Sequence, residues 1–352
     1  MTTFEDAAAA VGDLDDNAAR AAAEHHDRLT KPRGSLGRVE GIGVRLAAIA
    51  GTSPPPLPAP AAVAVFAGDH GVLAEGVTPW PQDVTAQMVQ NFLAGGAAIN
   101  VLARQSGARV VVVDVGIATP LDAAPDLERR KVRAGTGNLA REPAMTVAEA
   151  RGALDVGAAV AADLAAEGAA CLVTGDMGIG NTTPSAALVA AFTGHSAAEV
   201  TGRGTGIDDP TLARKVAAVE AGLARTPLRD DPLDVLASLG GLEIAALAGF
   251  VVGGAAAHVP VVVDGVIAGA ALLTAAHLVP GVVPFCFAGH RSTEPAAGVV
   301  LDVLGMEPVL DLELRLGEGT GACLALPVLE AGARILGEMA TFDAAGVTDK
   351  PG

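Results

Sequence analysis

Short apolar runs recur along this 352-residue chain, and each is followed by a polar or glycine-rich turn and then by an alanine-rich segment. Runs that are apolar at every position are typical of strands buried on both faces, as in parallel sheets. Their alternation with helical segments predicts an α/β fold, doubly wound around a mainly parallel sheet. The expected strands are 62–67, 109–113, 170–173, 261–263 and 282–287.

The turns after the expected strands are where a ligand should bind, because ligands of doubly wound sheets lie beyond the carboxyl ends of the strands. We therefore expect these turns to form the wall of a site. They are Gly68-Asp69-His70-Gly71, Asp114-Val115-Gly116, 174–183, Asp264-Gly265 and Gly289-His290-Arg291-Ser292.

The two ends of the chain have a different pattern. Segments 4–29, 39–49 and 321–339 are predicted to be helical, and the proline-rich stretch 53–58 is expected to be a stiff linker. We expect a small helical domain built from 1–58 and 321–345, a large α/β catalytic domain at 59–320, and a disordered tail at 346–352.

The net charge of −17 argues against nucleic acid and acidic membrane surfaces as partners, since both are anionic. Any anionic ligand must then be held by local geometry. With 51% hydrophobic residues the chain can bury a large core.

Cys171, Cys286 and Cys323 are far apart in apolar sequence, which argues against a zinc site and favours a reducing, cytoplasmic location. The acidic N-terminus lacks the basic start of an export signal. Stretches 244–263 and 265–289 lack Asp, Glu, Lys and Arg, and each is long enough to span a bilayer. Because prolines interrupt them and Asp264 separates them, we expect buried core instead.

The segment from Gly175 to Thr183 has the strongest local signal. It follows an expected strand and precedes a helix, so its glycines let backbone N–H groups converge at a helix N-terminus and form an anion cradle. A capped strand–helix junction without a ligand is an equally good interpretation of this segment alone. The residues expected to take part are Gly175, Gly178, Ile179, Gly180, Asn181, Thr182 and Thr183.

A second glycine loop, Gly202-Arg203-Gly204-Thr205-Gly206, offers an arginine to a phosphate, and Lys215 lies on the following helix. Glycine-rich surface loops are common, so the signal is weak alone. Two such loops in one α/β chain make a nucleotide-like ligand more plausible.

Glu318 stands between two glycines in Arg315-Leu316-Gly317-Glu318-Gly319. Because neither neighbour has a side chain, the carboxylate is accessible to a ligand, which suits a general base. On local chemistry alone, a helix N-terminal glutamate favoured by the helix dipole is the better interpretation.

Other chemistries find less support. No serine or cysteine nucleophile stands in an elbow with a histidine, which argues against a hydrolytic triad. A metal site at Asp69, His70 and His290 is conceivable but disfavoured. The two acids that follow a strand in many diphosphate-dependent phosphoribosyltransferases are missing, because Asp114 stands alone.

Taken together and in order, the motifs resemble the nicotinate mononucleotide–dimethylbenzimidazole phosphoribosyltransferases of cobalamin lower-ligand synthesis. The likeness covers nearly the whole chain. Its landmarks are Lys31-Pro32-Arg33-Gly34-Ser35-Leu36-Gly37-Arg38, Asp69-His70-Gly71-Val72, Val84-Thr85-Ala86, Asp114-Val115-Gly116-Ile117, 178–184, Asp264-Gly265, Met306-Glu307-Pro308 and Arg315-Leu316-Gly317-Glu318-Gly319.

The resemblance implies a homodimer that acts on small molecules, nicotinate mononucleotide and a benzimidazole base, with no metal or organic cofactor. It implies that Glu318 is the catalytic base, with Asp176 in support, and that the nucleotide phosphate lies on the two glycine loops. Asp264, Arg315, Gly317 and Gly319 join Gly202, Arg203, Gly204 and Lys215 in the expected nucleotide site. The expected base pocket is Trp80, Gln87, Met88, Met177 and Leu316.

The chain departs from some relatives, which have Glu in place of Asp176 and Ser and Gln in place of Trp80 and Met88. The role of Asp176 and the choice of acceptor base therefore stay open, and Trp80 and Met88 could equally be core residues. Two rival functions remain: a nucleotide-binding module without catalysis, and a hydrolase-like enzyme acting on a phosphorylated substrate.

Overall fold

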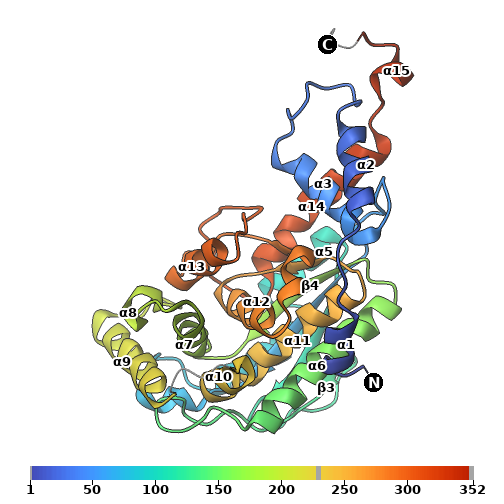
Figure 1. Cartoon of the computed structure of the whole chain (residues 1–352). Coiled ribbons are helices and arrows are strands. Elements are labelled where there is room, and N and C mark those ends of the chain that lie inside the picture. Colours follow the sequence, from blue (N-terminus) through green and yellow to red (C-terminus); the bar gives the residue numbers. More distant parts are fainter. Residues whose placement is uncertain (1, 227–230, 349–352) are drawn as a thin grey trace.

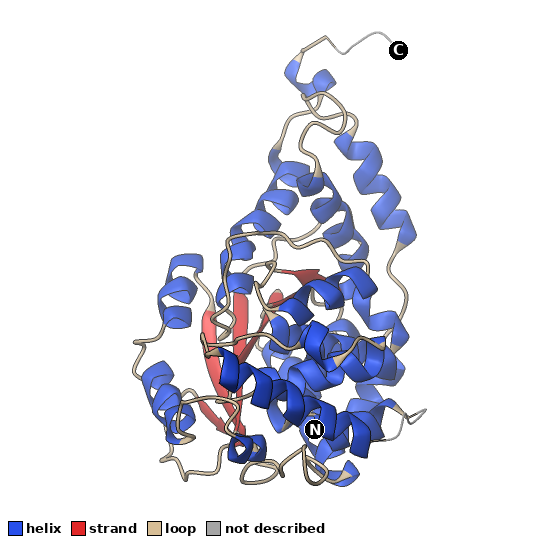
Figure 2. Cartoon of the chain, turned by 90° about the vertical axis from the view of Figure 1, so that its left-hand side faces the viewer, coloured by secondary structure: helices blue, strands red, loops and turns tan. Residues whose placement is uncertain are grey.

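A computed structural model describes residues 2–226 and 231–348. Its centre is a six-stranded, all-parallel sheet in the order β3-β2-β1-β4-β5-β6, which confirms the expected doubly wound α/β fold (Figures 1 and 2). The strands are β1 (Ala61–Gly68), β2 (Arg109–Gly116), β3 (Leu127–Arg129), β4 (Cys171–Met177), β5 (Val261–Val263) and β6 (Cys286–Ala288).

Helices enclose the sheet on both faces (Figure 2). They are α1 (Phe4–Ala10), α2 (Asp16–His26), α3 (Arg38–Ala50), α4 (Asp83–Leu93), α5 (Ala98–Ser106), α6 (Val147–Ala166), α7 (Thr182–Thr193), α8 (Ala197–Val200), α9 (Asp209–Arg225), α10 (Pro232–Leu239), α11 (Leu242–Ala256), α12 (Val266–Leu278), α13 (Pro295–Val303), α14 (Thr320–Glu338) and α15 (Phe342–Ala345), with the 3-10 turns η1 (Gly71–Glu75) and η2 (Pro280–Phe285).

The strand order reverses between β1 and β4, because β1 leads outward to β2 whereas β4 leads to β5 on the other side. All eight residues of β1 are buried, as its continuous apolar sequence predicts for a central strand. Such a reversal leaves a crevice at the carboxyl ends of the two strands, and this is the usual ligand site of the fold.

Several elements differ from the sequence-based expectation. The expected helix 4–29 is two helices, because Gly12 weakens helix propagation and the Asp15 carboxylate caps α2 by accepting hydrogen bonds from two of its first amides. Most of the expected strand 282–287 is the 3-10 turn η2, in which Pro284 has no N–H for a ladder, so only β6 pairs with β5. Strand β3 was not expected.

The helices from the two chain ends pack together: α2, α3 and α14 contact one another and project from the body in Figure 1. Leu29 and Thr341 form a β-bridge beside them. Helix α1 packs instead on α6 and α11, where the Phe4 N–H donates to the Asp155 carboxylate (2.7 Å). The boundaries of the small helical domain stay a prediction. Of the expected tail, residues 349–352 lie outside the described part of the chain.

The two uncharged stretches are core, as expected. They divide into α11, β5, α12, η2 and β6, and α11 is buried along nearly its whole length. One described helix, α14, is long and apolar enough to cross a membrane by length and composition alone, but 56% of its 18-residue apolar stretch is buried inside the protein. A buried core helix accounts for that result.

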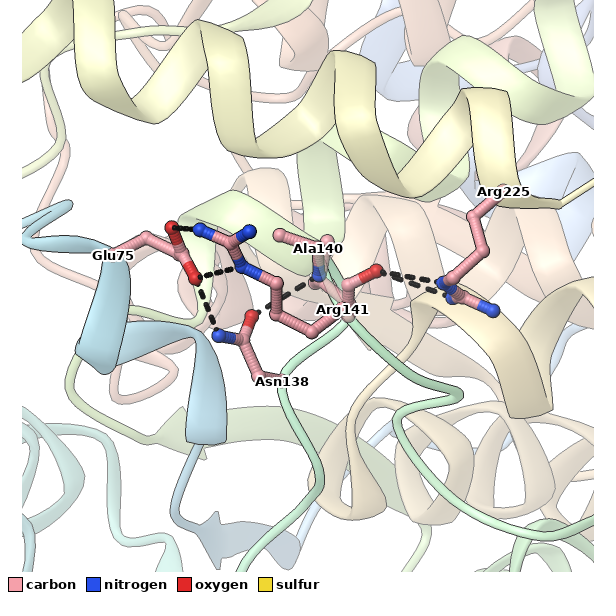
Figure 3. A network of polar contacts seen from close by, with 6 residues as sticks. Glu75, Asn138, Ala140, Arg141 and Arg225 are labelled. Carbon is pink, nitrogen blue, oxygen red and sulfur yellow. Dashed lines mark hydrogen bonds and ion pairs between the residues drawn. The ribbon is translucent and has the colours of Figure 1, made fainter.

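A network of polar contacts on one side of the molecule fixes the segment that follows β1 (Figure 3). The Glu75 carboxylate, at the end of η1, accepts hydrogen bonds from Asn138 Nδ2 (2.7 Å) and from Arg141 Nε (2.9 Å) and Nη2 (3.0 Å). From α9, the Arg225 guanidinium donates to the Leu139 carbonyl. The network ties η1 to the loop at 138–141 and to α9, and so anchors the start of the segment that lines the cavity described below.

Helices α6 and α11 meet backbone to backbone because glycines replace side chains at their contact. A Cβ added at Gly157 would lie 1.8 Å from the carbonyl oxygen of Ala246, and one at Gly249 would lie 2.0 Å from that of Leu154. Neither position admits a methyl group without separating the helices. The abundance of Gly and Ala therefore has a packing role here.

We expect Gly157→Ala to lower the free energy of unfolding by at least about 1–3 kcal/mol, the usual cost of an overpacked core. The matched control is Gly152→Ala on the same helix, where the new Cβ would meet Val132 Cγ1 at an ordinary 3.6 Å. That change should be neutral or stabilise by about 0.5–1 kcal/mol through helix propensity. Urea denaturation of both variants measures the difference, and equal stabilities would contradict the packing argument.

Candidate active site

A cavity of about 370 Å³ opens at the carboxyl ends of β4, β5 and β6, beside the reversal in strand order. One part of its wall is apolar and the other is rich in glycine and polar groups. The apolar residues are Val77, Trp80, Val84, Met88, Met177, Ile179, Ile207, Val266, Ile267 and Leu316. The remaining lining residues are Thr78, Asp176, Gly178, Gly180, Asn181, Thr182, Arg203, Gly204, Thr205, Lys215, Gly265, His290, Ser292, Glu294, Arg315, Gly317 and Glu318.

The loop between β4 and α7 brings backbone amides and a helix N-terminus to the polar end. Gly178 must be glycine, because a Cβ there would lie 2.5 Å from the carbonyl oxygen of Gly68. Gly180 has φ +88°, and the Ile179 N–H donates to Thr85 Oγ1 (3.1 Å), which holds the loop on α4. The loop therefore delivers the positive end of α7 to the cavity.

Lys215 on α9 adds a cation to this end. Its Nζ donates to Thr182 Oγ1 and to the carbonyl of Gly202, both at 2.8 Å. Burial lowers the pKa of Lys215 to about 8, although the charge of Glu294 opposes that effect. A buried ammonium beside a helix N-terminus makes the cradle suited to a phosphate.

The second glycine loop is held by side chains from three directions. Besides Lys215, the Gly204 N–H donates to Glu294 Oε1 (2.8 Å) and the Gly204 carbonyl accepts from Arg315 Nη1 (2.9 Å). The Arg203 guanidinium, although it lines the cavity, donates to the Ile207 carbonyl and pairs with Asp209. The Arg203 guanidinium and both backbone groups of Gly204 are thus paired within the protein.

Glu318 lies in a backbone conformation that its flanking glycines make possible. Gly317, Glu318 and Gly319 have φ of +84°, +65° and +91°. The Glu318 side chain does not cap α14. Its Oε2 accepts the Ile99 N–H (3.3 Å) at the first turn of α5. Burial raises the pKa of Glu318, and the charge of Asp264 adds to this, while the Ile99 amide opposes it. The carboxyl group thus has the raised pKa of a general base.

Asp176 is buried close by, and its Oδ2 accepts a hydrogen bond from Asn181 Nδ2 (3.0 Å). Burial raises its pKa well above the ordinary value, and the charges of Asp264, Glu243 and Glu318 raise it further, against the Asn181 hydrogen bond. Asp176 is therefore harder to ionise than an ordinary aspartate, and a different hydrogen-bond partner separates it from Glu318.

The structure brings most of the expected site residues into one cavity. Those that do not line it are Gly175, Thr183, Gly202, Asp264, Gly319 and Gln87. Gly175 and Gly319 support the wall through close backbone packing, Gly202 leaves room for the side chains of Glu294 and Pro295, and Asp264 lies behind the wall. Gln87 is exposed on α4.

Sequence reasoning missed Val77, Thr78, Val84, Ile207, Val266, Ile267 and Glu294. The apolar ones carry no local chemical signal. Glu294 precedes a proline that begins α13, a helix-start pattern that was available but that says nothing about a cavity. Within residues 2–226 and 231–348 no cluster of three or more His, Cys, Asp or Glu side chains is arranged to hold a metal. A reaction without metal stays a prediction.

Comparison with known proteins places this geometry in a family. A family model described as phosphoribosyltransferase matches residues 11–347. A nicotinate-nucleotide–dimethylbenzimidazole phosphoribosyltransferase from Salinispora tropica is 56% identical and covers 99% of this chain and 100% of the relative. A protein of the same name from Chloroflexus aurantiacus is 55% identical, with 97% of each chain covered.

Solved structures of proteins with this name also resemble the chain. A crystal structure of a protein of that name from Thermus thermophilus superposes with a TM-score of 0.92 at 48% identity, covering 96% of this chain and 100% of that one. The match extends through the terminal helices as well as the sheet, so it confirms the expected resemblance over the whole chain. With a family model matched from 11 to 347 and relatives 55–56% identical, the chain belongs to the nicotinate-nucleotide–dimethylbenzimidazole phosphoribosyltransferase family.

Proposed function

We propose that this protein transfers the phosphoribosyl group of nicotinate mononucleotide to 5,6-dimethylbenzimidazole or a related base, giving α-ribazole 5'-phosphate and nicotinate, with Glu318 as general base. The observation that supports this best is the position of Glu318. It is a buried carboxyl group with a raised pKa in the same cavity as the anion cradle and the apolar wall. A nucleotide phosphate and a planar apolar base match those two walls.

The donor binds through its phosphate at the polar end. The amides of Gly178 and Gly180, the Thr182 hydroxyl and the Lys215 ammonium hold the phosphate, and the ribose then extends toward Glu318. The acceptor base lies between Met88, Leu316 and the other apolar side chains. Fixing both rings in one cavity supplies orientation, which is a large part of the rate enhancement of such reactions.

The chemistry needs one base and no acid. The bond between C1' of the ribose and the pyridinium nitrogen breaks, and its electron pair neutralises the departing nicotinate ring. One imidazole nitrogen of the acceptor forms the new bond to C1' from the opposite face, so a β-nucleotide gives an α-riboside. The proton on the other nitrogen moves to Glu318. Asp176, whose pKa burial raises well above its ordinary value, has a supporting role, and Glu318 is the proton acceptor.

We further propose a homodimer in the cytoplasm. The exposed apolar side chains of Trp80 and Leu316, 50% and 58% accessible at the cavity wall, support coverage by a second subunit. Three free, buried thiols support a reducing compartment. The net charge of −17 supports small-molecule substrates over nucleic acid.

Glu318→Gln should lower kcat by about 10²–10⁴-fold, the usual contribution of a general base. Binding of nicotinate mononucleotide, measured by calorimetry, should persist because the cradle is unchanged. Glu338→Gln, at the exposed far end of α14, the helix that follows Glu318, is the control and should keep wild-type turnover. A Glu318→Gln enzyme with normal kcat would contradict the assignment of the base.

The pH profile of kcat/KM should be bell-shaped. A general base works only when deprotonated, so activity should be lost as pH falls through the raised pKa of Glu318. On the alkaline side the cradle loses its cation as pH rises through about 8, the pKa of Lys215. Glu318→Gln should remove the acid limb from the residual activity, and Lys215→Met should remove the alkaline limb. Flat profiles between about pH 5 and 9 would argue against both roles.

The apolar wall should favour dimethylbenzimidazole over adenine, because the adenine amino group would be buried without a partner at a cost of about 1–3 kcal/mol. Competition between the two bases should therefore show a preference of about 5- to 150-fold. Met88→Gln should reduce this preference by offering a polar partner. Gln90→Ala, an exposed change on the same helix, should leave it unaltered. Equal use of both bases by the wild type would show that this wall does not select the acceptor.

A further inference from the structure

His290 and Asp264 form a buried pair that the steps above do not use. Asp264 follows β5 and His290 follows β6, so the parallel sheet places them side by side. His290 Nε2 lies 3.4 Å from Asp264 Oδ1, and the two side chains are 2% and 0% exposed. The pair adjoins the first turn of α14, the helix that begins directly after Glu318.

Asp264 binds the backbone that carries Glu318. Its Oδ2 accepts the Gly319 N–H (3.2 Å) and its Oδ1 accepts the Ala322 N–H (2.9 Å). These amides belong to a helix start, where no backbone partner exists, and no side chain of α14's own N-cap supplies one. Because Gly319 is the neighbour of Glu318, the two hydrogen bonds to Asp264 fix the turn from which the Glu318 side chain extends.

His290 is locked against the same turn. A Cβ at Gly321 would lie 1.9 Å from His290 Cδ2, so the ring occupies the space that any other residue at 321 would fill. On either side of His290 the backbone pairs with Leu310, which donates to the Gly289 carbonyl (3.1 Å) and accepts the Arg291 N–H (2.8 Å). The backbone on both sides of His290 and the contact of its ring with Gly321 therefore hold the ring beside Asp264.

The surroundings strengthen this pair. A small cavity of about 20 Å³ behind it is lined by Leu272, Val300, Met306 and other apolar side chains, apart from the pair itself. Charges in such surroundings interact more strongly than they do in water. An Asp264 carboxylate without a counter-charge would be costly here, and the His290 imidazole, a cation when protonated, lies within reach of it.

We propose that His290 is a positioning residue for Glu318. In its protonated form, His290 directs an N–H at Asp264 and keeps the Asp264 carboxylate on the Gly319 and Ala322 amides. It also offsets the negative charge of Asp264 beside Glu318. The inference rests on the proposed role of Glu318 as general base. His290 itself touches no reacting atom in this assignment. It acts through Asp264 on the direction and the charge state of the Glu318 carboxyl group.

The titration of these groups agrees with the geometry. Burial lowers the pKa of His290, but the hydrogen bond and charge of Asp264, followed by the backbone of Arg291 and the charge of Asp311, outweigh it and raise that pKa above the ordinary value. The charge of Asp264 acts in turn on Glu318, Asp176 and Cys323, raising the pKa of each. Removing the imidazolium leaves Asp264 uncompensated, so the pKa of Glu318 should rise further.

The test is His290→Gln, which keeps an N–H donor for Asp264 but carries no charge. We expect kcat to fall about 10- to 100-fold, the usual cost of losing a partner that orients a functional ligand. The KM for nicotinate mononucleotide should change little, because the phosphate cradle is untouched. The acid limb of kcat/KM should move to higher pH by about one unit. His277→Gln removes a histidine that stacks on Phe192 outside the cavity, and this control should match the wild type.

Two comparisons separate this inference from the proposed function. In a Glu318→Gln background, His290→Gln should cause no further loss, because both changes act on the same proton transfer. If Glu318→Gln keeps wild-type turnover, the proposed base fails. If Glu318→Gln is inactive while His290→Gln keeps the wild-type kcat and acid limb, only the positioning role fails. A loss of nucleotide binding and thermal stability without a shift of the limb would also overturn that role.

A measurement on the unmodified protein tests the charge state independently of how the variants fold. In ¹⁵N-histidine spectra at about pH 6, below the raised pKa, both ring nitrogens of His290 should carry protons. A neutral imidazole at that pH would overturn the proposal.

Discussion

The backbone of Glu318 lies directly on the backbone of strand β4. A Cβ at Gly175 would lie 2.6 Å from the Glu318 carbonyl oxygen, and one at Gly319 would lie 2.9 Å from that of Thr174. Glycine at both positions lets a segment near the end of the chain cross the carboxyl end of the central sheet. Without this contact, Glu318 and the anion cradle, which lies more than a hundred residues earlier in the sequence, would not share a cavity.

The same contact brings three carboxyl groups together, those of Asp176, Asp264 and Glu318. Each of them has different hydrogen-bond partners. Asp176 has an amide side chain as its partner and a strongly raised pKa. Asp264 has two helix amides and His290. Glu318 has one amide at the start of α5 and faces the cavity. Groups of one chemical type thereby acquire separate properties, which is the usual way that an enzyme assigns different tasks to neighbouring acids.

The fold and the polar end of the cavity could be predicted from the sequence, because both depend on local sequence patterns. Apolar runs followed by glycine-rich turns are enough to predict a parallel sheet and to place Gly178 and Asn181 at its carboxyl edge. The importance of Glu318 came from the ordered motifs of a known family, since a glycine-flanked glutamate by itself is better explained as a helix cap. In the structure Glu318 does precede a helix, α14, but its carboxylate accepts a hydrogen bond from the first turn of a different helix, α5, which no local pattern indicates.

The apolar end could not be predicted in the same way. Val77, Val84 and Ile267 look like core residues, and they line the cavity only because segments far apart in the chain meet there. The prediction of a strand at 282–287 was wrong for a related reason. Its residues are apolar enough for a longer strand, but Pro284 and the contacts of η2 with α11 and α12 turn the first part of the run into a 3-10 helix. Long-range packing decided both outcomes.

Glu318 also carries a backbone cost, because a glutamate at φ +65° is disfavoured by about 1–2 kcal/mol relative to ordinary backbone. The hydrogen bonds of Asp264 to the next turn, and that of Thr320 Oγ1 to the Gly317 carbonyl (2.8 Å), offset this cost. The geometry of the base is thus maintained by its surroundings rather than by its own preference. The anion cradle likewise depends on its immediate surroundings, because the net charge of the chain is −17 and does not attract an anion. Salt screens surface charges beyond about 8 Å, so Lys215 and the α7 amides set the local potential that an anion meets.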